Sequence, residues 1–220
     1  MDARTILKGM RSALGEESWT ALGEMSRNDG PENPFKVLIG TILSHRTRDE
    51  RTAEATDSLF KRFRSAKDLA GAKADEVMEL IRGVGFYRVK SQRIIEVARI
   101  INERYGGRVP DTLEELLELP SVGRKTANCV LVYGFKKEAI PVDTHVHRIA
   151  NRLGIVHTKK PEETELGLRK FFPKKDWLEV NDLFVSFGKT VCKPVGPRCI
   201  ICPLKEGCSY YEKVVKIQKL

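Results

Sequence analysis

The chain has 220 residues, enough to bury the core of one large domain or of two small ones. Hydrophobic residues make up 41% and charged residues 31%, and no apolar run reaches the ~20 residues of a membrane-spanning helix, so no such helix is expected. Lysine and arginine number 39 against 30 acidic residues, a formal net charge of +9. This excess favours a polyanionic partner, nucleic acid before an acidic membrane surface, although solubility alone also explains such a charge.

Apolar residues recur at helical spacing in five segments, at residues 34–44, 76–81, 91–106, 143–154 and 176–188. A sixth segment, 111–119, begins with Thr112 and has Glu115 three residues later, the pattern of a capping box. Pro120 ends that segment. No stretch alternates as a β-strand would, so the sequence predicts an all-α fold with short loops.

The segment LPSVGRKTANCV, residues 119–130, joins the helix at 111–119 to a second helix, which predicts a helix-hairpin-helix. Its turn exposes backbone N–H groups at the start of the second helix, a position that favours a phosphate group. Val122 is expected to pack inside the hairpin, and Arg124 adds positive charge. Such a turn holds the DNA backbone without reading base sequence. An ordinary turn between two helices has the same spacing, which therefore does not separate the two interpretations.

Lys125 stands in the first turn of this second helix, directly before an apolar run. Lysine belongs on exposed helix faces, and the dipole at a helix N-terminus disfavours an ammonium group. Partial burial there increases the fraction of neutral amine, which is the nucleophilic form of lysine. We therefore interpret Lys125 as a candidate nucleophile.

Asp143, His145 and His147 form a D-x-H-x-H string at the start of the segment 143–154. Asp143 is expected to cap the helix, and Gly154 is expected to end it. The string also offers metal donors, but on a helix residues 143 and 147 share a face that residue 145 does not. We therefore expect a helix cap rather than a metal site.

Four of the five cysteines follow the spacing C-x6-C-x2-C-x5-C, at Cys192, Cys199, Cys202 and Cys208. The chain starts without a visible secretory signal, so we expect a cytoplasmic protein, in which disulfides are rare. The spacing alone allows a structural zinc or a [4Fe–4S] cluster, since both bind four thiolates. Cys129 lies in an apolar stretch and is expected to be a core residue.

The segment 119–130, together with IPVDTHVHRIANRLG at residues 140–154, closely resembles the endonuclease III family of helix-hairpin-helix DNA glycosylases. The resemblance extends to the cysteine spacing and, more weakly, to LSHRTRD at residues 43–49. It implies that Lys125 attacks the sugar of a damaged nucleotide and that Asp143 assists. It also implies that the four cysteines hold a [4Fe–4S] cluster.

The same resemblance implies two helical domains, with the active site in the cleft between them. A six-helix domain with the hairpin is expected at residues 27–137, and an iron–sulfur domain at residues 1–26 and 138–220. The hairpin turn and the basic residues of the cysteine loop are expected to contact DNA phosphates, and the resemblance adds two positions where the family inserts side chains into the duplex. The expected DNA contacts are Arg46, Phe86, Ser121, Val122, Gly123, Arg124, Lys193 and Arg198.

The activity implied by the resemblance is that of a bifunctional DNA glycosylase and AP lyase of base excision repair. Such an enzyme removes oxidised or ring-saturated pyrimidines and cleaves 3′ to the abasic site by β-elimination through a lysine Schiff base. The expected partner is double-stranded DNA with damaged bases or abasic sites. The protein is expected to be a monomer that associates with the nucleoid and not with a membrane. Arg46 stands where the family has glutamine, and Ser121 where it has glycine. Because glycine relieves a tight backbone there, Ser121 is expected to strain the turn or to offer a hydroxyl to the phosphate.

Two other functions fit parts of the sequence. A mismatch-specific glycosylase of the same superfamily, acting on adenine or thymine, would share the hairpin. The adenine enzymes, however, usually lack the lysine found here at Lys125 and have an additional C-terminal domain. A non-catalytic iron–sulfur DNA-binding protein would use the hairpin and the cluster without chemistry, and the presence of both Lys125 and Asp143 argues against it.

Overall fold

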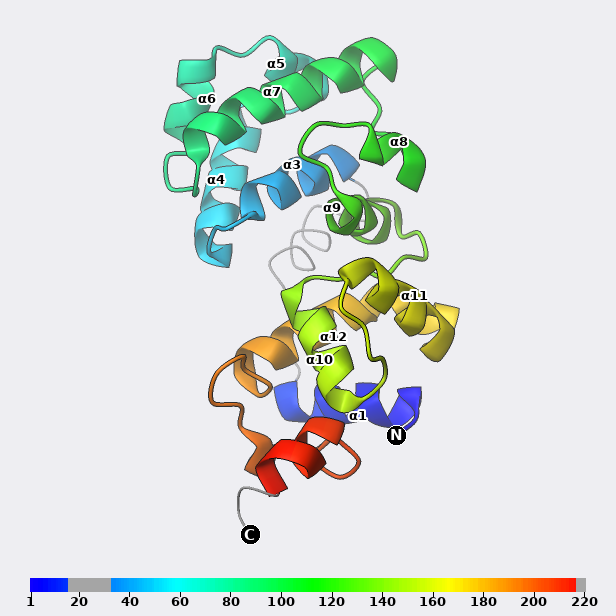
Figure 1. Ribbon diagram of the computed structural model, residues 1–220. Helices are drawn as coiled ribbons and strands as arrows, with labels where there is room; N and C mark the ends of the chain where they lie inside the picture. The colour runs from blue at the N-terminus through cyan, green and yellow to red at the C-terminus, as the bar shows by residue number, and fades with distance from the viewer. Residues whose placement is uncertain (16–32, 217–220) are drawn as a thin grey trace. The chain divides into compact units, whose positions relative to one another are not determined.

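The computed structural model of the chain describes residues 1–15 and 33–216 (Figure 1). These residues are mostly helical and contain no β-strand, which confirms the predicted all-α fold. None of the helices in the described ranges has the length and apolar character of a membrane span. The chain divides into two compact units, which we call the hairpin unit (Ala21–Lys137) and the cysteine unit (Met1–Thr20 with Glu138–Leu220). The domain boundary expected between residues 26 and 27 lies outside the described residues.

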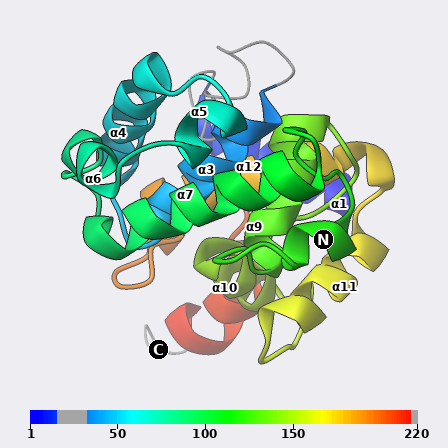
Figure 2. The ribbon, with the colours of Figure 1, turned by 90° about the horizontal axis from the view of Figure 1, so that it is seen from above.

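In the hairpin unit the helices are α3 (Pro34–Ser44), α4 (Asp49–Arg62), α5 (Ala66–Ala70), α6 (Ala74–Leu80), α7 (Tyr87–Arg104), α8 (Leu113–Leu117), α9 (Arg124–Cys129) and the π-helix η1 (Val130–Gly134). The buried helix predicted at 34–44 is α3, and Lys36 interrupts its otherwise buried stretch from Phe35 to Leu43. A helix that is apolar on all sides must be covered on all sides. Accordingly, α4, α7, α9 and η1 pack around α3, and α7 lies across it in Figure 2.

The predicted hairpin is formed by α8 and α9. The hydroxyl of Thr112 accepts a hydrogen bond from the Glu115 backbone N–H at 3.4 Å and donates one to the Glu115 carboxylate at 2.6 Å. The two predicted capping residues therefore meet, although the helix that they start ends at Leu117 and is shorter than expected. The turn is closed by the Val122 N–H, which donates to the carbonyl of Leu119 at 3.2 Å. The helix that follows runs without a break from α9 into η1.

In the cysteine unit the helices are α1 (Ala3–Leu14), α10 (Thr144–Leu153), α11 (Pro161–Phe171), η2 (Lys174–Asp176), α12 (Trp177–Thr190), η3 (Cys199–Ile201) and η4 (Tyr211–Lys216). The apolar face of α1 packs against α12 in one core. Leu204 and Cys208 of the cysteine segment are buried in the same core. Apolar side chains from both ends of the chain thus form a single buried cluster, which explains why this unit is discontinuous in sequence.

Candidate active site and nucleic-acid interface

Lys125 lies half-buried in the first turn of α9, beside an uncharged histidine. The next residue, Thr126, is 3% exposed, and its hydroxyl lies 3.0 Å from Nε2 of His45. Burial, and then the positive charges of Lys125 and Lys90, lower the pKa of His45 to about 4. At neutral pH the candidate nucleophile therefore has a neutral imidazole near it rather than another cation. This role of His45 could not be predicted from the sequence, because its partner Thr126 lies 81 positions away.

The turn before α9 contains a strained residue and an open surface. Ser121 has a φ of +64°, a left-handed conformation that costs an L-residue about 1–2 kcal/mol. This is the strain expected where serine replaces glycine. Val122 is buried, as the hairpin interpretation requires. Gly123 has an ordinary φ of −95°, and a Cβ atom built on it would have no atom within 4 Å, so the fold itself does not require glycine at this position.

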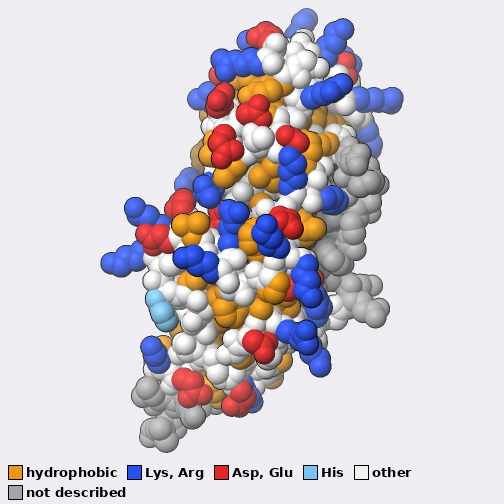
Figure 3. Space-filling view, turned by 90° about the vertical axis from the view of Figure 1, so that its right-hand side faces the viewer, with side chains coloured by type: hydrophobic (Ala, Val, Ile, Leu, Met, Phe, Trp, Pro, Cys, Tyr) orange, Lys and Arg blue, Asp and Glu red, His pale blue; other side chains and the backbone are white. Residues whose placement is uncertain are grey.

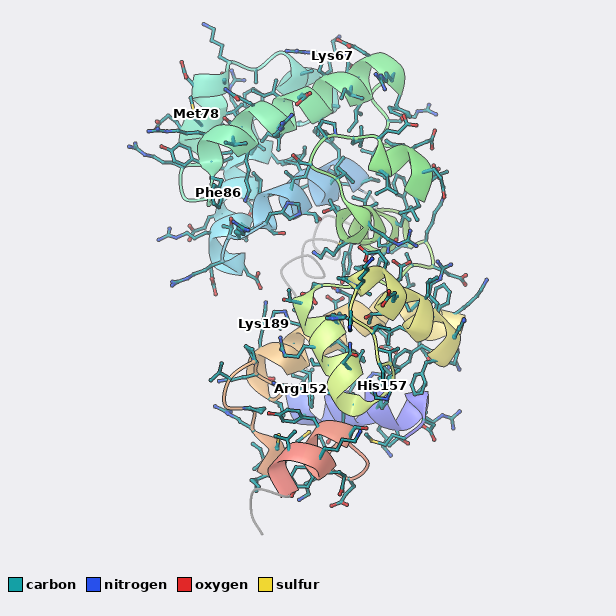
Figure 4. All side chains as sticks on the ribbon, viewed as in Figure 1. Lys67, Met78, Phe86, Arg152, His157 and Lys189 are labelled. Atoms are coloured by element: carbon teal, nitrogen blue, oxygen red, sulfur yellow. The ribbon has the colours of Figure 1, made fainter. Side chains whose placement is uncertain are left out.

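Arg46 and Phe86 come from separate loops and form an exposed pair. The guanidinium carbon of Arg46 lies 5.8 Å from the ring centroid of Phe86, and Phe86 is 62% exposed. Figure 4 labels Phe86 on the hairpin unit. Both residues have left-handed backbones, with φ of +53° and +59°. Two strained residues that present an aromatic ring and a cation to solvent are a candidate functional feature, because strain of this kind persists only where surrounding contacts impose it.

Asp143 caps α10 with one carboxylate oxygen and contacts a histidine with the other. Its Oδ1 accepts hydrogen bonds from the backbone N–H groups of His145 at 2.9 Å and Val146 at 2.8 Å. Its Oδ2 lies 3.1 Å from Nδ1 of His145. The prediction of a cap is confirmed, and Gly154 ends the helix with a φ of +80°.

The expectation that residues 143 and 147 share a face is wrong, because Asp143 stands outside the helix and helical spacing does not apply to a cap. His145 is the histidine that reaches Asp143, whereas Nδ1 of His147 lies 2.7 Å from the hydroxyl of Thr164 on α11. Both histidines of the string therefore have protein partners. Asp143 belongs to the cysteine unit and Lys125 to the hairpin unit.

The four cysteines of the C-terminal segment line one cavity of the cysteine unit. Burial raises the pKa of Cys199 and Cys208, and it raises the pKa of Cys202 to about 11. Negative charge on neighbouring thiols raises these pKa values further. Four thiolates would repel one another here unless a cationic group replaced their protons, so the donor set fits an iron–sulfur or metal centre. Cys129 belongs to the hairpin unit, where it is fully buried as a core residue.

Among the residues that the structure describes, no group of three or more His, Cys, Asp or Glu side chains is placed to hold a single metal ion.

Arg152 ties the loop after Cys192 to α10. Its guanidinium donates to the carbonyls of Lys193 at 2.7 Å and Pro194 at 3.0 Å, and Nη1 lies 3.5 Å from the sulfur of Cys192. The guanidinium also lies over the ring of Tyr210, 4.4 Å from its centroid, and Figure 4 shows Arg152 on α10. The sequence offered no signal for this contact.

The two basic residues predicted in the cysteine loop are accessible. Arg198 is exposed and Lys193 is half-buried, and both belong to the loop that leaves the cavity at Cys192 and returns at Cys199. Lysine and arginine side chains are interspersed with acidic and hydrophobic ones on the face shown in Figure 3. The overall charge of +9 is thus not gathered into a single patch on that face.

Residues 39–174 match the family described as HhH-GPD superfamily base excision DNA repair protein. Endonuclease III of Thermotoga maritima is 54% identical over 187 residues, which are 85% of this chain and 88% of that protein. Endonuclease III of Bacillus subtilis is 38% identical over 82% of this chain and 83% of that protein. A trapped endonuclease III–DNA covalent intermediate matches with a TM-score of 0.85 at 33% identity over 96% of both chains.

A thermostable thymine-DNA glycosylase is structurally similar but more distant in sequence, with a TM-score of 0.81 at 26% identity over 96% of this chain and 94% of that one. The higher identity to endonuclease III, over most of both sequences, decides between the two branches. The chain therefore belongs to the HhH-GPD superfamily of base excision DNA repair proteins and, within it, to the endonuclease III family of DNA glycosylases and AP lyases.

Proposed function

We propose that this enzyme removes oxidised or ring-saturated pyrimidines from double-stranded DNA, and then cleaves the strand 3′ to the abasic site. The observation that carries the proposal is the position of Lys125, half-buried at the start of α9 behind an open turn and near the neutral His45. A primary amine at this position is a nucleophile for a sugar carbon. Membership of the endonuclease III family supports this role.

In the proposed mechanism the neutral amine of Lys125 attacks C1′ of a nucleotide flipped out of the duplex. The bond from C1′ to the base breaks, and the base leaves with the bonding electrons and takes up a proton. The C1′–O4′ bond of the sugar then breaks, O4′ takes up a proton, and the amine nitrogen loses its two protons to give an imine of the opened sugar. Protonation of this Schiff base acidifies the C2′ hydrogen, and loss of that proton expels the 3′ phosphate by β-elimination.

Asp143 stabilises the positive charge that develops on the sugar as the base departs. Its carboxylate is held by the hydrogen bonds to Oδ1 and by the contact of Oδ2 with His145, so its orientation is set before the substrate binds. The mechanism requires Lys125 and Asp143 to reach the same nucleotide in the DNA complex. Neutral His45 adds no cation beside Lys125 and so does not disfavour the iminium.

We assign the turn at Ser121, Val122 and Gly123 to a phosphate of the DNA backbone, with Arg124 as an additional cation. The bare surface of Gly123 supports this, since a phosphate can approach its backbone N–H closely. Lys193 and Arg198 would contact a second stretch of backbone. Arg46 and Phe86 would fill the gap left by the flipped nucleotide, because an exposed aromatic side chain can stack on bases and a neighbouring cation can bind phosphate or base edges.

We further infer that Cys192, Cys199, Cys202 and Cys208 hold a [4Fe–4S] cluster. The shared cavity and the raised pKa values of its buried thiols support this assignment. Such a cluster supplies cross-linking of the C-terminal segment and one-electron redox chemistry, and with four thiolate ligands it has no open iron position for a substrate. We propose a monomer that works on chromosomal DNA at the nucleoid.

Borohydride trapping tests the proposed function. On a duplex with an abasic site, sodium borohydride should reduce the Schiff base and yield a stable enzyme–DNA adduct. The Lys125→Gln variant keeps length and polarity but has no nucleophile, so it should fold, bind DNA and form no adduct. An adduct that persists in Lys125→Gln would assign the nucleophile to another amine. A wild-type protein that binds abasic DNA but neither nicks it nor forms an adduct would favour the non-catalytic DNA-binding alternative.

A panel of duplexes separates the remaining alternatives. Duplexes with oxidised or ring-saturated pyrimidines should be cleaved, whereas duplexes with an undamaged thymine or adenine in a mismatch should not. Cleavage of mismatches in preference to damaged pyrimidines would contradict the proposed substrates and show the preference of a mismatch-specific glycosylase.

A further inference from the structure

Lys90 is a buried lysine whose three donors are all used. It lies near the start of α7, is 8% exposed, and points to the segment that follows α3. Its Nζ donates to the carbonyl of Leu43 at 2.7 Å, to the carbonyl of His45, and to the hydroxyl of Thr47 at 3.2 Å. Burying an ammonium group is costly unless such bonds replace its water. A side chain that needed only to fill space would more simply be apolar.

The segment that Lys90 binds is in direct contact with the loop before α7. The hydroxyl of Thr47 accepts a hydrogen bond from the Gly85 N–H at 3.1 Å. A Cβ atom on Gly85 would lie 2.6 Å from the carbonyl oxygen of Arg46, so the two backbones approach as closely as glycine allows. Arg46 and Phe86 are the exposed residues at this junction, and both are held in left-handed conformations.

We propose that Lys90 is a positioning residue, whose ammonium group locks the loop of residues 45–47 against the loop of residues 85–86 and so presents Arg46 and Phe86 as one rigid wedge to DNA. The inference rests on the proposed function in that it assigns these two side chains to the gap in the duplex. The left-handed backbones of Arg46 and Phe86 are strained, so without the lock the loops relax and the pair separates. Arg46 and Phe86 would then have to be ordered when the protein binds DNA, which would lower its affinity for a duplex with a gap.

The number of N–H donors makes the lock sensitive to pH. The ammonium group has three donors for three acceptors, whereas the neutral amine has two. Burial lowers the pKa of Lys90 to about 8, so the third donor is lost as the pH rises through that value. The titratable group that faces Lys90 from the end of α3 is His45, which is uncharged throughout this range because its pKa is about 4.

The test compares two dissociation constants for each protein. One is measured on a duplex with a tetrahydrofuran abasic analogue, which the lyase cannot cleave, and the other on the undamaged duplex. Lys90→Met keeps the volume of the side chain and removes its donors, and it should reduce the preference for the abasic analogue about tenfold, or 1.4 kcal/mol. Lys67→Met, at an exposed lysine on α5 (Figure 4), is the matched control and should leave the preference unchanged.

Hydrogen exchange of the Gly85 amide reports on the lock directly, because this N–H is bonded to Thr47. Exchange should be faster in Lys90→Met, and the wild-type preference for the abasic analogue should fall as the pH rises from about 7 to about 9 while that of Lys90→Met stays flat. Unchanged exchange, or faster exchange with an unchanged preference, overturns the inference. A wild-type preference that does not vary with pH also overturns it.

Two further measurements keep the outcomes separate. If Lys90→Met does not fold, Thr47→Val takes its place, since it removes the hydroxyl that both Lys90 and Gly85 contact, and an unchanged preference there overturns the inference. Failure of the borohydride adduct would refute the proposed chemistry alone, because binding to the tetrahydrofuran analogue requires no reaction. Phe86→Ala should reduce the preference as strongly as Lys90→Met, and an unaffected preference would refute the wedge itself.

Discussion

Gly123→Ala separates what the hairpin turn needs for folding from what it needs for DNA. The backbone at Gly123, with φ −95° and ψ 177°, is accessible to alanine, and the new methyl group would meet no protein atom within 4 Å. Alanine is a poorer N-cap than glycine but restricts the unfolded chain, so the free energy of unfolding should change by less than about 1 kcal/mol. Stability measured by urea denaturation should therefore stay close to that of the wild type.

The same methyl group would occupy the surface that we assign to a phosphate. A net hydrogen bond from a backbone N–H to a charged group is worth about 1.5–3 kcal/mol, which corresponds to about a tenfold to 150-fold increase in the dissociation constant. Fluorescence anisotropy on a labelled duplex, over a series of salt concentrations, measures this loss. Because no cation is removed, the slope of log K against log salt should stay the same, whereas Arg124→Gln should lower it by about 0.9.

The control is Gly71→Ala at the end of α5. A Cβ atom there would make ordinary contacts at 3.8 Å and 3.9 Å, and its φ is −89°, so the substitution should leave both folding and DNA binding unchanged. If Gly123→Ala binds DNA as tightly as the wild type, no phosphate contacts this turn. If Gly123→Ala unfolds the protein, the fold itself requires glycine at this position, contrary to what its φ and its surroundings indicate.

Three further predictions concern other residues of the two units. Ser121→Gly should relieve the left-handed backbone and, after the larger entropy of glycine in the unfolded chain, stabilise the protein by about 0.5 kcal/mol, or about 1–2 °C in Tm by calorimetry; a lower Tm would show that Ser121 makes a stabilising contact. Asp143→Asn should keep the helix cap but lower the rate of base excision by orders of magnitude, while cleavage at preformed abasic sites persists in a gel assay; equal loss of both would assign Asp143 to the lyase step as well. Cys199→Ser should reduce the iron content of protein purified without air, whereas Cys129→Ser should leave it at about four irons per chain; zinc in place of iron in the wild type would contradict the cluster.

The helices that could be predicted are those whose own residues carry a clear signal, such as a continuous apolar stretch or a cap and a terminating glycine. The buried helix α3 is apolar throughout, and α10 has both its cap and its final glycine within residues 143–154. Helix α4 was not predicted, because its buried face includes Thr52 and Thr56. The Thr52 and Thr56 hydroxyls donate to the carbonyls of Arg48 and Thr52, so both side chains are buried with their polar groups satisfied. Because threonine does not count as apolar, the helical periodicity of apolar residues in this segment is weak.

The candidate site was predicted only as far as its residues lie in recognisable motifs. The strain at Ser121 followed from the expectation of glycine at that position. Lys90 and His45 carried no such signal, because their roles depend on a loop that meets α7 from more than 40 positions away in the chain. A lysine in an amphipathic helix is ordinarily exposed, and only tertiary contacts show that this one is buried.

The discontinuous cysteine unit has a consequence for folding during synthesis. Residues 33–137 form contacts within themselves, so the hairpin unit can become compact once the ribosome has released Lys137. Helix α1 is made before α12 and Leu204, so it cannot bury Ile6, Leu7 and Met10 until they have been made. Three large apolar side chains therefore remain available to chaperones while the rest of the chain is translated. Helix α1 is thus made well before the segments that bury its apolar face, and slow translation should prolong its exposure.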